Sequence, residues 1–263
     1  MHRYFRLLQV LTLAAAGFTH AHATTAPDCS RRLTLALHDH GLLYSSETDS
    51  GIDRDFADEL IRRSGCQVAV SVMSRARIWQ LLETGALDFS LSGIASDERN
   101  TFAGFAWYFS NKYYLLVRRD AGVASLADFA RRPELRLGAI RGFRYGERAN
   151  RLLEQLQAEQ RVEYATRLEP LYQLLRRHRI HAMIVEPFDY PEIEAAPLRA
   201  LTTLVDTGDP AIRHGLIMSK KSVPATDQEK WRALVDGMRA DGTVRRIFDK
   251  YFSPELARSM TEF

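Results

Sequence analysis

The segment "GIDRDFADELIRRSGCQVAVSVMSRARIWQLLETGALDFSLSG", Gly51 to Gly93, alternates helix and strand patterns twice. Ile52, Phe56 and Leu60 fall on one stripe at helical spacing, and Gly65 is typical of a helix end. The letters QVAVSVM then place a valine at every second position, as in a half-buried strand. A second helix, RIWQLLETG, and a second strand, LDFSLSG, follow. This alternation predicts an α/β fold with parallel strands and helices on both faces of the sheet.

The rest of the chain repeats the pattern. RLTLALH is a strand before the segment, and YYLLVRR is a strand after it. The alternation then restarts with SLADFARR, LRLGAI, a helix near 145–160, a short strand near Val162, LEPLYQLLRRH and IHAMIVE. The restart indicates a second lobe of ordinary domain size. Residues 204–221 have no regular pattern, and two helices are expected to finish the chain.

The N-terminus has the composition of an exported protein. Residues 1–23 carry Arg3 and Arg6, an apolar core over 7–18 and an Ala-His-Ala cleavage site, which predicts a secretory signal peptide. Removing it lowers the formal charge from +3 to about +1, which gives no footprint for nucleic acid. Cys29 and Cys66 in an exported chain predict one disulfide, with two buried thiols as the alternative.

Candidate functional residues follow the strands. Ligands of open α/β sheets collect at the carboxyl ends of the strands. The residues predicted to lie there are Tyr44, Arg75, 92–99, 141–145 and Glu186.

Arg99 is the most unusual of these residues. It falls in the first turn of a predicted helix, where the positive end of the helix dipole disfavours a cation. It is either a surface arginine paired with Asp97 or Glu98, or a bidentate clamp on a ligand carboxylate. Glu186 is likewise either a solvated acid or a counter-charge to a ligand ammonium.

Catalytic and metal signatures are mostly missing. The chain has no G-x-S-x-G, H-E-x-x-H, G-x-x-x-x-G-K or G-x-G-x-x-G motif. His38 and His40 share one strand face near the expected cleft, but spacing gives no third metal ligand. We therefore expect structural or pocket-lining histidines, with no metal and no cofactor. Tyr44, Phe143 and Tyr145 are either core or a platform for a ligand.

The order of several motifs resembles one family. GIDRDFADEL, LLETGALDFSLSGIASDER, FAWYFSNKYYLLVRR, SLADFARRPELRLGAIRG, IHAMIVEP and MRADGTVRRIFDKYF follow one another along nearly the whole mature chain. In this order they resemble a family 3 extracellular solute-binding protein, the periplasmic amino-acid-binding component of ABC importers.

The resemblance implies a two-lobed periplasmic-binding-protein fold of type II, in which two hinge crossings join the lobes. Lobe 1 is then expected over residues 24–117 and 216–263, and lobe 2 over residues 118–215. By the resemblance, Arg99 binds a carboxylate beside backbone donors of 92–95, and Glu186 faces an ammonium. The ligand-binding residues so predicted are Tyr44, Arg75, Ser92, Gly93, Ile94, Ala95, Arg99, Arg141, Gly142, Phe143 and Glu186.

Departures from the family pattern broaden the expected ligand class. The turn between Gly93 and Arg99 is one residue short, and Ala95 replaces a hydroxyl residue. Glu186 is longer than the usual aspartate, and Arg75 replaces an aromatic residue. The expected ligand is a polar amino acid or a related organic anion. The changes, together with Arg141 and Arg144 near the mouth of the cleft, weaken the inference to an ordinary α-amino acid and favour a dicarboxylate, an acidic amino acid or another organic anion.

The resemblance thus implies a periplasmic, monomeric, non-enzymatic protein that delivers a small carboxylate ligand to an ABC permease and binds no nucleic acid. One alternative is an enzyme similar to cyclohexadienyl dehydratase, with Glu186 as a general acid in a desolvated cleft. Another is an accessory binding protein for a periplasmic dehydrogenase or a sensor system. The fold does not decide among these three.

Overall fold

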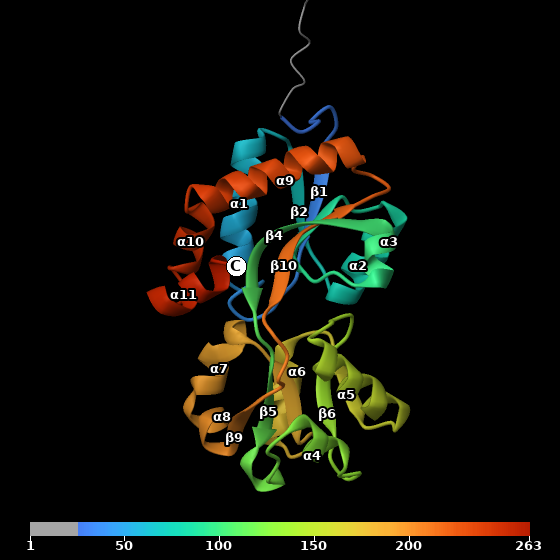
Figure 1. Cartoon of the computed structure of the whole chain (residues 1–263), viewed down its shortest axis with the longest axis vertical. Coiled ribbons are helices and arrows are strands. Elements are labelled where there is room, and N and C mark those ends of the chain that lie inside the picture. The colour runs from blue at the N-terminus through green and yellow to red at the C-terminus, as the bar shows by residue number, and fades with distance from the viewer. Residues whose placement is uncertain (1–25) are drawn as a thin grey trace, which may run out of the picture.

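The structure is a computed structural model and describes residues 26–263. The signal peptide predicted for residues 1–23 lies outside the described residues. Two α/β lobes are stacked along the long axis of the molecule (Figure 1), and each is built on a five-stranded sheet. The predicted α/β, two-lobed fold is therefore confirmed.

Lobe 1 contains both ends of the described chain. Its strands are β1 (Leu33–Leu37), β2 (Val68–Val72), β3 (Phe89–Gly93), β4 (Ala103–Asn111) and β10 (Ile212–Ser219). Its helices are α1 (Ile52–Ser64), α2 (Arg75–Thr84), α3 (Asp97–Phe102), α9 (Ala225–Ala240), α10 (Thr243–Phe248) and α11 (Pro254–Thr261).

Lobe 2 is formed by the middle of the chain. Its strands are β5 (Tyr114–Arg118), β6 (Leu137–Ile140), β7 (Val162–Ala165), β8 (Ala182–Val185) and β9 (Thr202–Asp206). Its helices are α4 (Leu126–Ala130), α5 (Glu147–Ala158), α6 (Leu168–Arg176), α7 (Tyr190–Glu194) and α8 (Ala196–Leu201), with 3-10 turns η1 (Arg119–Ala121) and η2 (Pro187–Asp189).

The two sheets have the same plan. Strand order is β2-β1-β3-β10-β4 in lobe 1 and β7-β6-β8-β5-β9 in lobe 2. β10 and β5 run antiparallel to both of their neighbours. These are the two strands that enter a sheet directly from the other lobe. In each sheet, therefore, the antiparallel pairs are those made by the strand that follows a crossing.

The crossings lie at residues 112–113 and 207–211, between β4 and β5 and between β9 and β10. They are linked, because Thr207 Oγ1 donates a hydrogen bond of 3.0 Å to the carbonyl of Tyr113. The sequence placed the lobe boundaries at 117 and 216 instead. In residues 103–119 two largely apolar strands are separated only by the short polar stretch 110–112, and the first crossing begins at its end.

The C-terminal part of the chain is also more regular than expected. Most of residues 204–221, predicted to be irregular, belongs to β9 and β10, whose pairing partners β5 and β4 are far away in the sequence. A third helix, α11, follows the two helices that were predicted.

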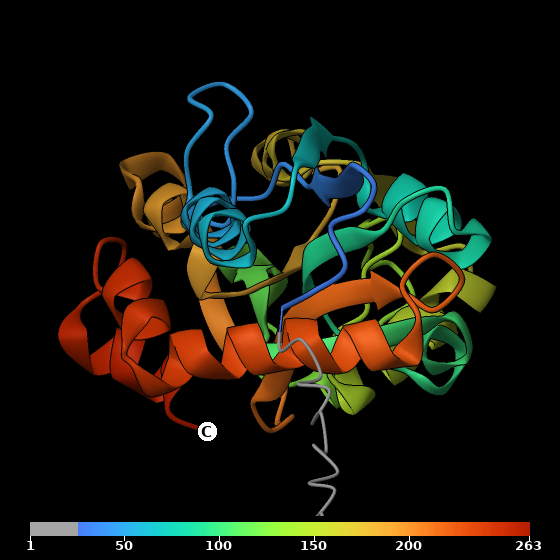
Figure 2. The ribbon, with the colours of Figure 1, turned by 90° about the horizontal axis from the view of Figure 1, so that it is seen from above.

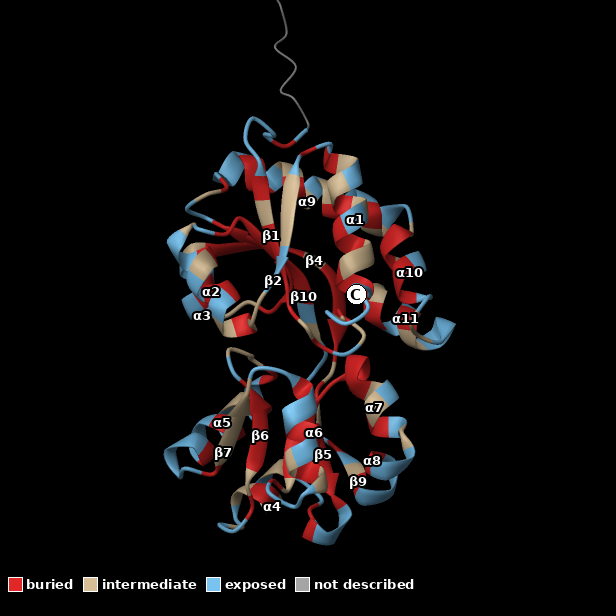
Figure 3. Cartoon of the chain, turned by 180° about the vertical axis from the view of Figure 1, so that it is seen from behind, coloured by how far each residue is buried: buried red, intermediate tan, exposed pale blue. Residues whose placement is uncertain are grey.

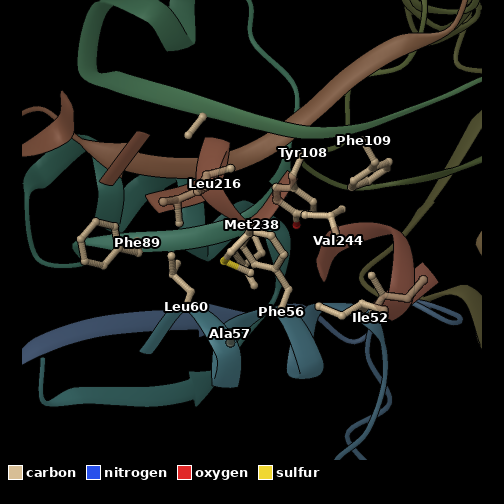
Figure 4. Packing of buried hydrophobic residues seen from close by; sticks show 14 of the residues in the cluster. Ile52, Phe56, Ala57, Leu60, Phe89, Tyr108, Phe109, Leu216, Met238 and Val244 are labelled. Atoms are coloured by element: carbon tan, nitrogen blue, oxygen red, sulfur yellow. The ribbon is translucent and has the colours of Figure 1, made fainter. Parts of the chain in front are cut away.

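Helices cover both faces of each sheet, and the strands between them are largely buried (Figure 3). Seen from above, the long helix α9 runs along one side of lobe 1 (Figure 2). The main core of this lobe packs α1 and the C-terminal helices against the sheet, with Phe56 stacked on Tyr108 at 3.9 Å between ring centroids (Figure 4). Apolar burial of this kind is the main force that stabilises each lobe.

Cys29 and Cys66 form the predicted disulfide, which ties the N-terminal segment to the residue after the α1 C-terminus. Closing a loop of this size contributes about 4 kcal/mol in the chain-entropy estimate. Among residues 26–263, no helix is both long and apolar enough to span a bilayer.

Candidate functional site

A small cavity lies between the lobes, and we refer to it as the interlobe cavity. Its volume of about 20 Å³ is room for roughly one water molecule, so the lobes stand in a closed arrangement. The residues that line it are Leu43, Arg75, Trp79, Ser92, Gly93, Ile94, Arg99, Tyr113, Gly142, Phe143, Arg144, Glu186 and His214.

Arg99 reaches the cavity from the first turn of α3. The helix begins at Ser96, whose Oγ accepts the N–H of Arg99 at 3.2 Å. The guanidinium donates to the carbonyls of Ile94 and Gly142, each at 2.9 Å, and stacks over Trp79 at 3.8 Å. Two of its five N–H groups are used in these bonds, which leaves three for a ligand.

The charge of Arg99 is poorly compensated. Within residues 26–263, no carboxylate oxygen lies within 4.0 Å of its guanidinium, although the residue is only 7% exposed. Burial and the neighbouring cation Arg75 lower the pKa of Arg99 to about 9. The sequence alternative of a surface ion pair with Asp97 or Glu98 is therefore not what the structure shows.

Arg75 is a second buried cation on the same cavity. It opens α2, donates Nη1–H to the carbonyl of Leu91 at 2.9 Å, and lies 5.6 Å from the centre of the Phe143 ring. Burial lowers the pKa of Arg75, and the charge of Asp53 opposes that shift. No described carboxylate lies within 4.0 Å of this guanidinium either.

The end of β3 is held by a buried network. Ser92 has a φ of 54° and donates its hydroxyl to Asp53 Oδ1 at 2.6 Å, and Tyr108 donates to the same oxygen at 3.1 Å. Burial raises the pKa of Asp53 to about 6. This network fixes the turn that carries Gly93 and Ile94. The Ser92 hydroxyl donates its hydrogen bond to Asp53 and not into the cavity.

Glu186 lies at the end of β8, beside the first crossing. His40 Nε2 donates to its Oε1 at 2.9 Å, and Asn111 Nδ2 donates to its Oε2 at 2.6 Å. Asp189 Oδ1 lies 3.6 Å from the same imidazole, and Asp189 Oδ2 accepts the backbone N–H of Glu186 at 3.0 Å. Glu186 therefore has an imidazole and an amide from lobe 1 on its two oxygens.

The pKa values of this cluster follow from the same contacts. Burial opposes a charged ring, but Asp189 and Glu186 together raise the pKa of His40. Burial alone would raise the pKa of Glu186, yet the hydrogen bond and charge of His40 hold it below its ordinary value. Burial raises the pKa of Asp189 to about 7. These contacts favour the ionised form of Glu186 and the protonated form of His40.

The other histidines behave differently. His38 is buried against the Phe143 ring at 5.4 Å, its pKa is lowered by burial, and neither ring nitrogen has a hydrogen-bond partner among the described residues. Burial lowers the pKa of His214 to about 4, and its Nε2 lies 2.9 Å from the Tyr113 hydroxyl. No group of three or more possible metal ligands occurs within residues 26–263.

Two contacts close the outer side of the cavity, and we call them the lip. The Cα of Gly142 lies against the backbone of Ala76, so closely that an added Cβ would be 2.8 Å from Ala76 Cα. Arg144 and Glu98 form an exposed ion pair of 3.1 Å across the same edge. An exposed pair contributes little stability, so close packing at Gly142 is the main lip contact.

The structure does not bring every predicted residue to the cavity. Tyr44 packs in the core of lobe 1 and donates its hydroxyl to Asp49 at 3.0 Å. Arg141 is exposed and lies over the Tyr164 ring at 4.8 Å, in a groove outside the lip. Ala95 packs beside a smaller core cluster on the α2 side of lobe 1.

The remaining predicted residues line the cavity: Arg75, Ser92, Gly93, Ile94, Arg99, Gly142, Phe143 and Glu186.

Sequence reasoning missed several groups around the site. Trp79 belongs to a buried core cluster of lobe 1 and also supports the Arg99 guanidinium, a contact that the sequence did not indicate. Asp53 looked like an ordinary acid of a first helical turn. Nothing in the sequence indicated a role for Asn111. The only sign for Asp189 was its position three residues after Glu186, the spacing of the capping box that the structure shows at η2.

Two α/β lobes, two crossings and a cation-lined cavity between the lobes define a two-lobed binding protein of type II. The family model of bacterial extracellular solute-binding proteins, family 3, matches residues 42–254, and the chain belongs to this family.

Solved structures support the fold. A substrate-binding protein of an ABC uptake transporter from Streptococcus pneumoniae, with bound histidine, superposes with a TM-score of 0.71 at 17% identity, covering 84% of this chain and 92% of that one. An ancestral arginine-binding protein bound to arginine gives 0.71 at 19% identity, with coverages of 84% and 98%.

An ancestral amino-acid-binding protein that is a precursor of cyclohexadienyl dehydratase gives a TM-score of 0.70 at 20% identity, with coverages of 84% and 96%. A search of curated proteins found no match.

Proposed function

We propose that this protein is a periplasmic solute-binding protein that captures a small carboxylate-bearing ligand in the interlobe cavity and delivers it to an ABC importer. The observation that carries the proposal is the pair of buried, weakly compensated cations Arg75 and Arg99 on a cavity between two lobes. A buried cation is costly unless an anion pairs with it, so a carboxylate ligand supplies what the cavity needs.

The closed arrangement supports capture by hinge closure. The cavity as it stands is too small for an organic acid, so a ligand enters when the lip opens and is enclosed as the lobes approach. Arg99 contributes both to ligand binding and to closure. Its guanidinium lines the cavity from lobe 1, where it bonds Ile94, and it also bonds Gly142 of the other lobe. Membership of the family, whose members include components of ABC transporters, supports delivery to a permease.

The enzyme alternative requires Glu186 to donate a proton. The pKa of Glu186 is instead lowered by His40, which favours a carboxylate that stays ionised. The contacts therefore support binding without catalysis, although a structural neighbour is a precursor of a dehydratase.

The proposal is tested by a thermal-shift screen of amino acids and organic acids. Ligand at a hundred times its dissociation constant should stabilise the protein by about 2.7 kcal/mol. Arg99→Ala should abolish the shift, whereas Arg141→Ala, which removes an exposed arginine outside the lip, should keep it. If no small acid stabilises the protein while a large periplasmic partner co-purifies with it, the accessory-protein alternative replaces the proposal. Formation of an aromatic product from prephenate would establish the enzyme instead.

A further inference from the structure

We infer that His40 neutralises the only described carboxylate that lines the interlobe cavity, Glu186, so that the cavity selects organic acids without an amino group. The inference rests on the proposed function, because it concerns the ligand of the same cavity. Its consequence is a preference for an acid over the amino acid of the same carbon skeleton.

Glu186 already accepts hydrogen bonds from other residues of the protein. Both carboxylate oxygens accept hydrogen bonds from lobe 1, from His40 at 2.9 Å and from Asn111 at 2.6 Å, and the residue is 2% exposed. A ligand ammonium that approached Glu186 would have to share each carboxylate oxygen with a donor that is already bound to it. It would also stand beside the ring of His40, whose contacts with Glu186 and Asp189 favour a positive charge, and two like charges at close range in a buried site repel each other.

We expect the contact between His40 and Glu186 to persist when the lobes open. Asn111 is the last residue of β4 before the first crossing, and Val185, next to Glu186, pairs with Tyr114 just after it. Residues beside a hinge move least during closure. Glu186 therefore stays close to lobe 1 while the lip opens on the other side of the cavity.

A second contact fixes His40 to the same segment. The N–H of Leu42 donates to the carbonyl of Phe188 at 2.9 Å, and the Phe188 ring is fully buried in the aromatic cluster of lobe 1. Its ring lies 5.3 Å from that of Phe109 between centroids. The loop that carries His40 and the turn that follows Glu186 are thus packed together across the lobes.

The charge of the lining supports the same inference. The other charged residues that line the cavity are arginines, namely Arg75, Arg99 and Arg144. Arg144 is paired with Glu98, whereas Arg75 and Arg99 have no described carboxylate within 4.0 Å. A ligand carboxylate would meet the unpaired guanidinium groups of Arg75 and Arg99. A ligand ammonium would meet the same two cations and Glu186, whose charge His40 already offsets. The lining therefore complements an anion and opposes a zwitterion.

The test is calorimetric titration of the full mature protein with two matched pairs, 2-oxoglutarate against glutamate and succinate against aspartate. The amino-free acid of at least one pair should bind at least about a hundredfold more tightly than its partner, the size of effect seen for an unpaired charge at a buried interface. Equal or tighter binding of the amino acids overturns the inference and leaves the proposed function intact. Absence of binding by any small acid, with or without an amino group, overturns the proposed function itself.

A matched pair of variants locates the cause. His40→Gln removes the positive charge and keeps a donor for Glu186, while His38→Gln changes a neighbouring buried histidine that contacts no carboxylate. His40→Gln should reduce the preference for the amino-free acid at least tenfold, and His38→Gln should leave it unchanged. Equal preferences in the two variants overturn the role given to His40. If either variant fails to fold, the comparison of the matched pairs on the wild-type protein decides.

Discussion

Gly142 offers the sharpest test of closure, because its Cα touches the opposite lobe. It has a φ of 83°, and a Cβ built on it would be 2.8 Å from both the Cα and the N of Ala76. Both are backbone atoms, so no flexible side chain can move aside. Gly142→Ala should therefore keep the lobes from reaching the closed arrangement without a shift of one of them.

The size of the effect follows from packing. Forcing an extra methyl group into a close contact costs about 1–3 kcal/mol, and this cost falls only on the closed state. Ligand binding that depends on closure should then weaken by about 5- to 150-fold. Titration with the tightest acid of the screen measures the change, and small-angle scattering measures the shift toward an open shape.

Gly122→Ala is the matched control. Gly122 also has a left-handed backbone, with a φ of 61°, but nothing lies within 4 Å of an added Cβ. Both substitutions carry the backbone cost of a left-handed alanine, about 1–2 kcal/mol. If Gly142→Ala binds ligand as tightly as Gly122→Ala, then the lip contact does not limit binding and the closed arrangement is not the bound one.

Three further predictions concern stability. Asp189→Asn should remove a carboxyl whose pKa rises from 3.8 to about 7 on folding. Because the wild-type protein loses stability as the pH rises through that window, the free energy of unfolding of the variant should rise by about 3 kcal/mol relative to wild type between pH 5 and pH 8. A difference that does not grow with pH would contradict the assignment. Phe188→Ala should cost about 3–5 kcal/mol in urea unfolding because the ring is fully buried in lobe 1, and a loss below about 1 kcal/mol would show that it is not packed there. Replacing Cys29 and Cys66 by serine should cost about 4 kcal/mol, and a melting temperature that is equal with and without reductant would speak against the disulfide.

Local pattern was enough for the general architecture. The spacing of Ile52, Phe56 and Leu60 predicts α1, and the residues after each parallel strand predict where a site forms, because carboxyl ends of parallel strands share one edge. The position of Arg99 in the first turn of a helix was visible for the same reason. Its environment, with Trp79 beneath it, required the fold.

Long-range contacts were beyond local pattern. His40 and Glu186 are 146 residues apart, and their hydrogen bond depends on how two lobes close on each other. A histidine near a strand end predicts a pocket at most, and it does not identify its partner. The same limit explains Asp53 of α1, whose partners Ser92 and Tyr108 come from strands β3 and β4.

A crystal structure of the protein with the tightest acid of the screen tests the central claim most directly. We expect closed lobes, a ligand carboxylate within hydrogen-bond distance of the Arg99 guanidinium, and His40 still bonded to Glu186. A ligand carboxylate bound away from Arg99, or a ligand ammonium on Glu186 in place of His40, would contradict it.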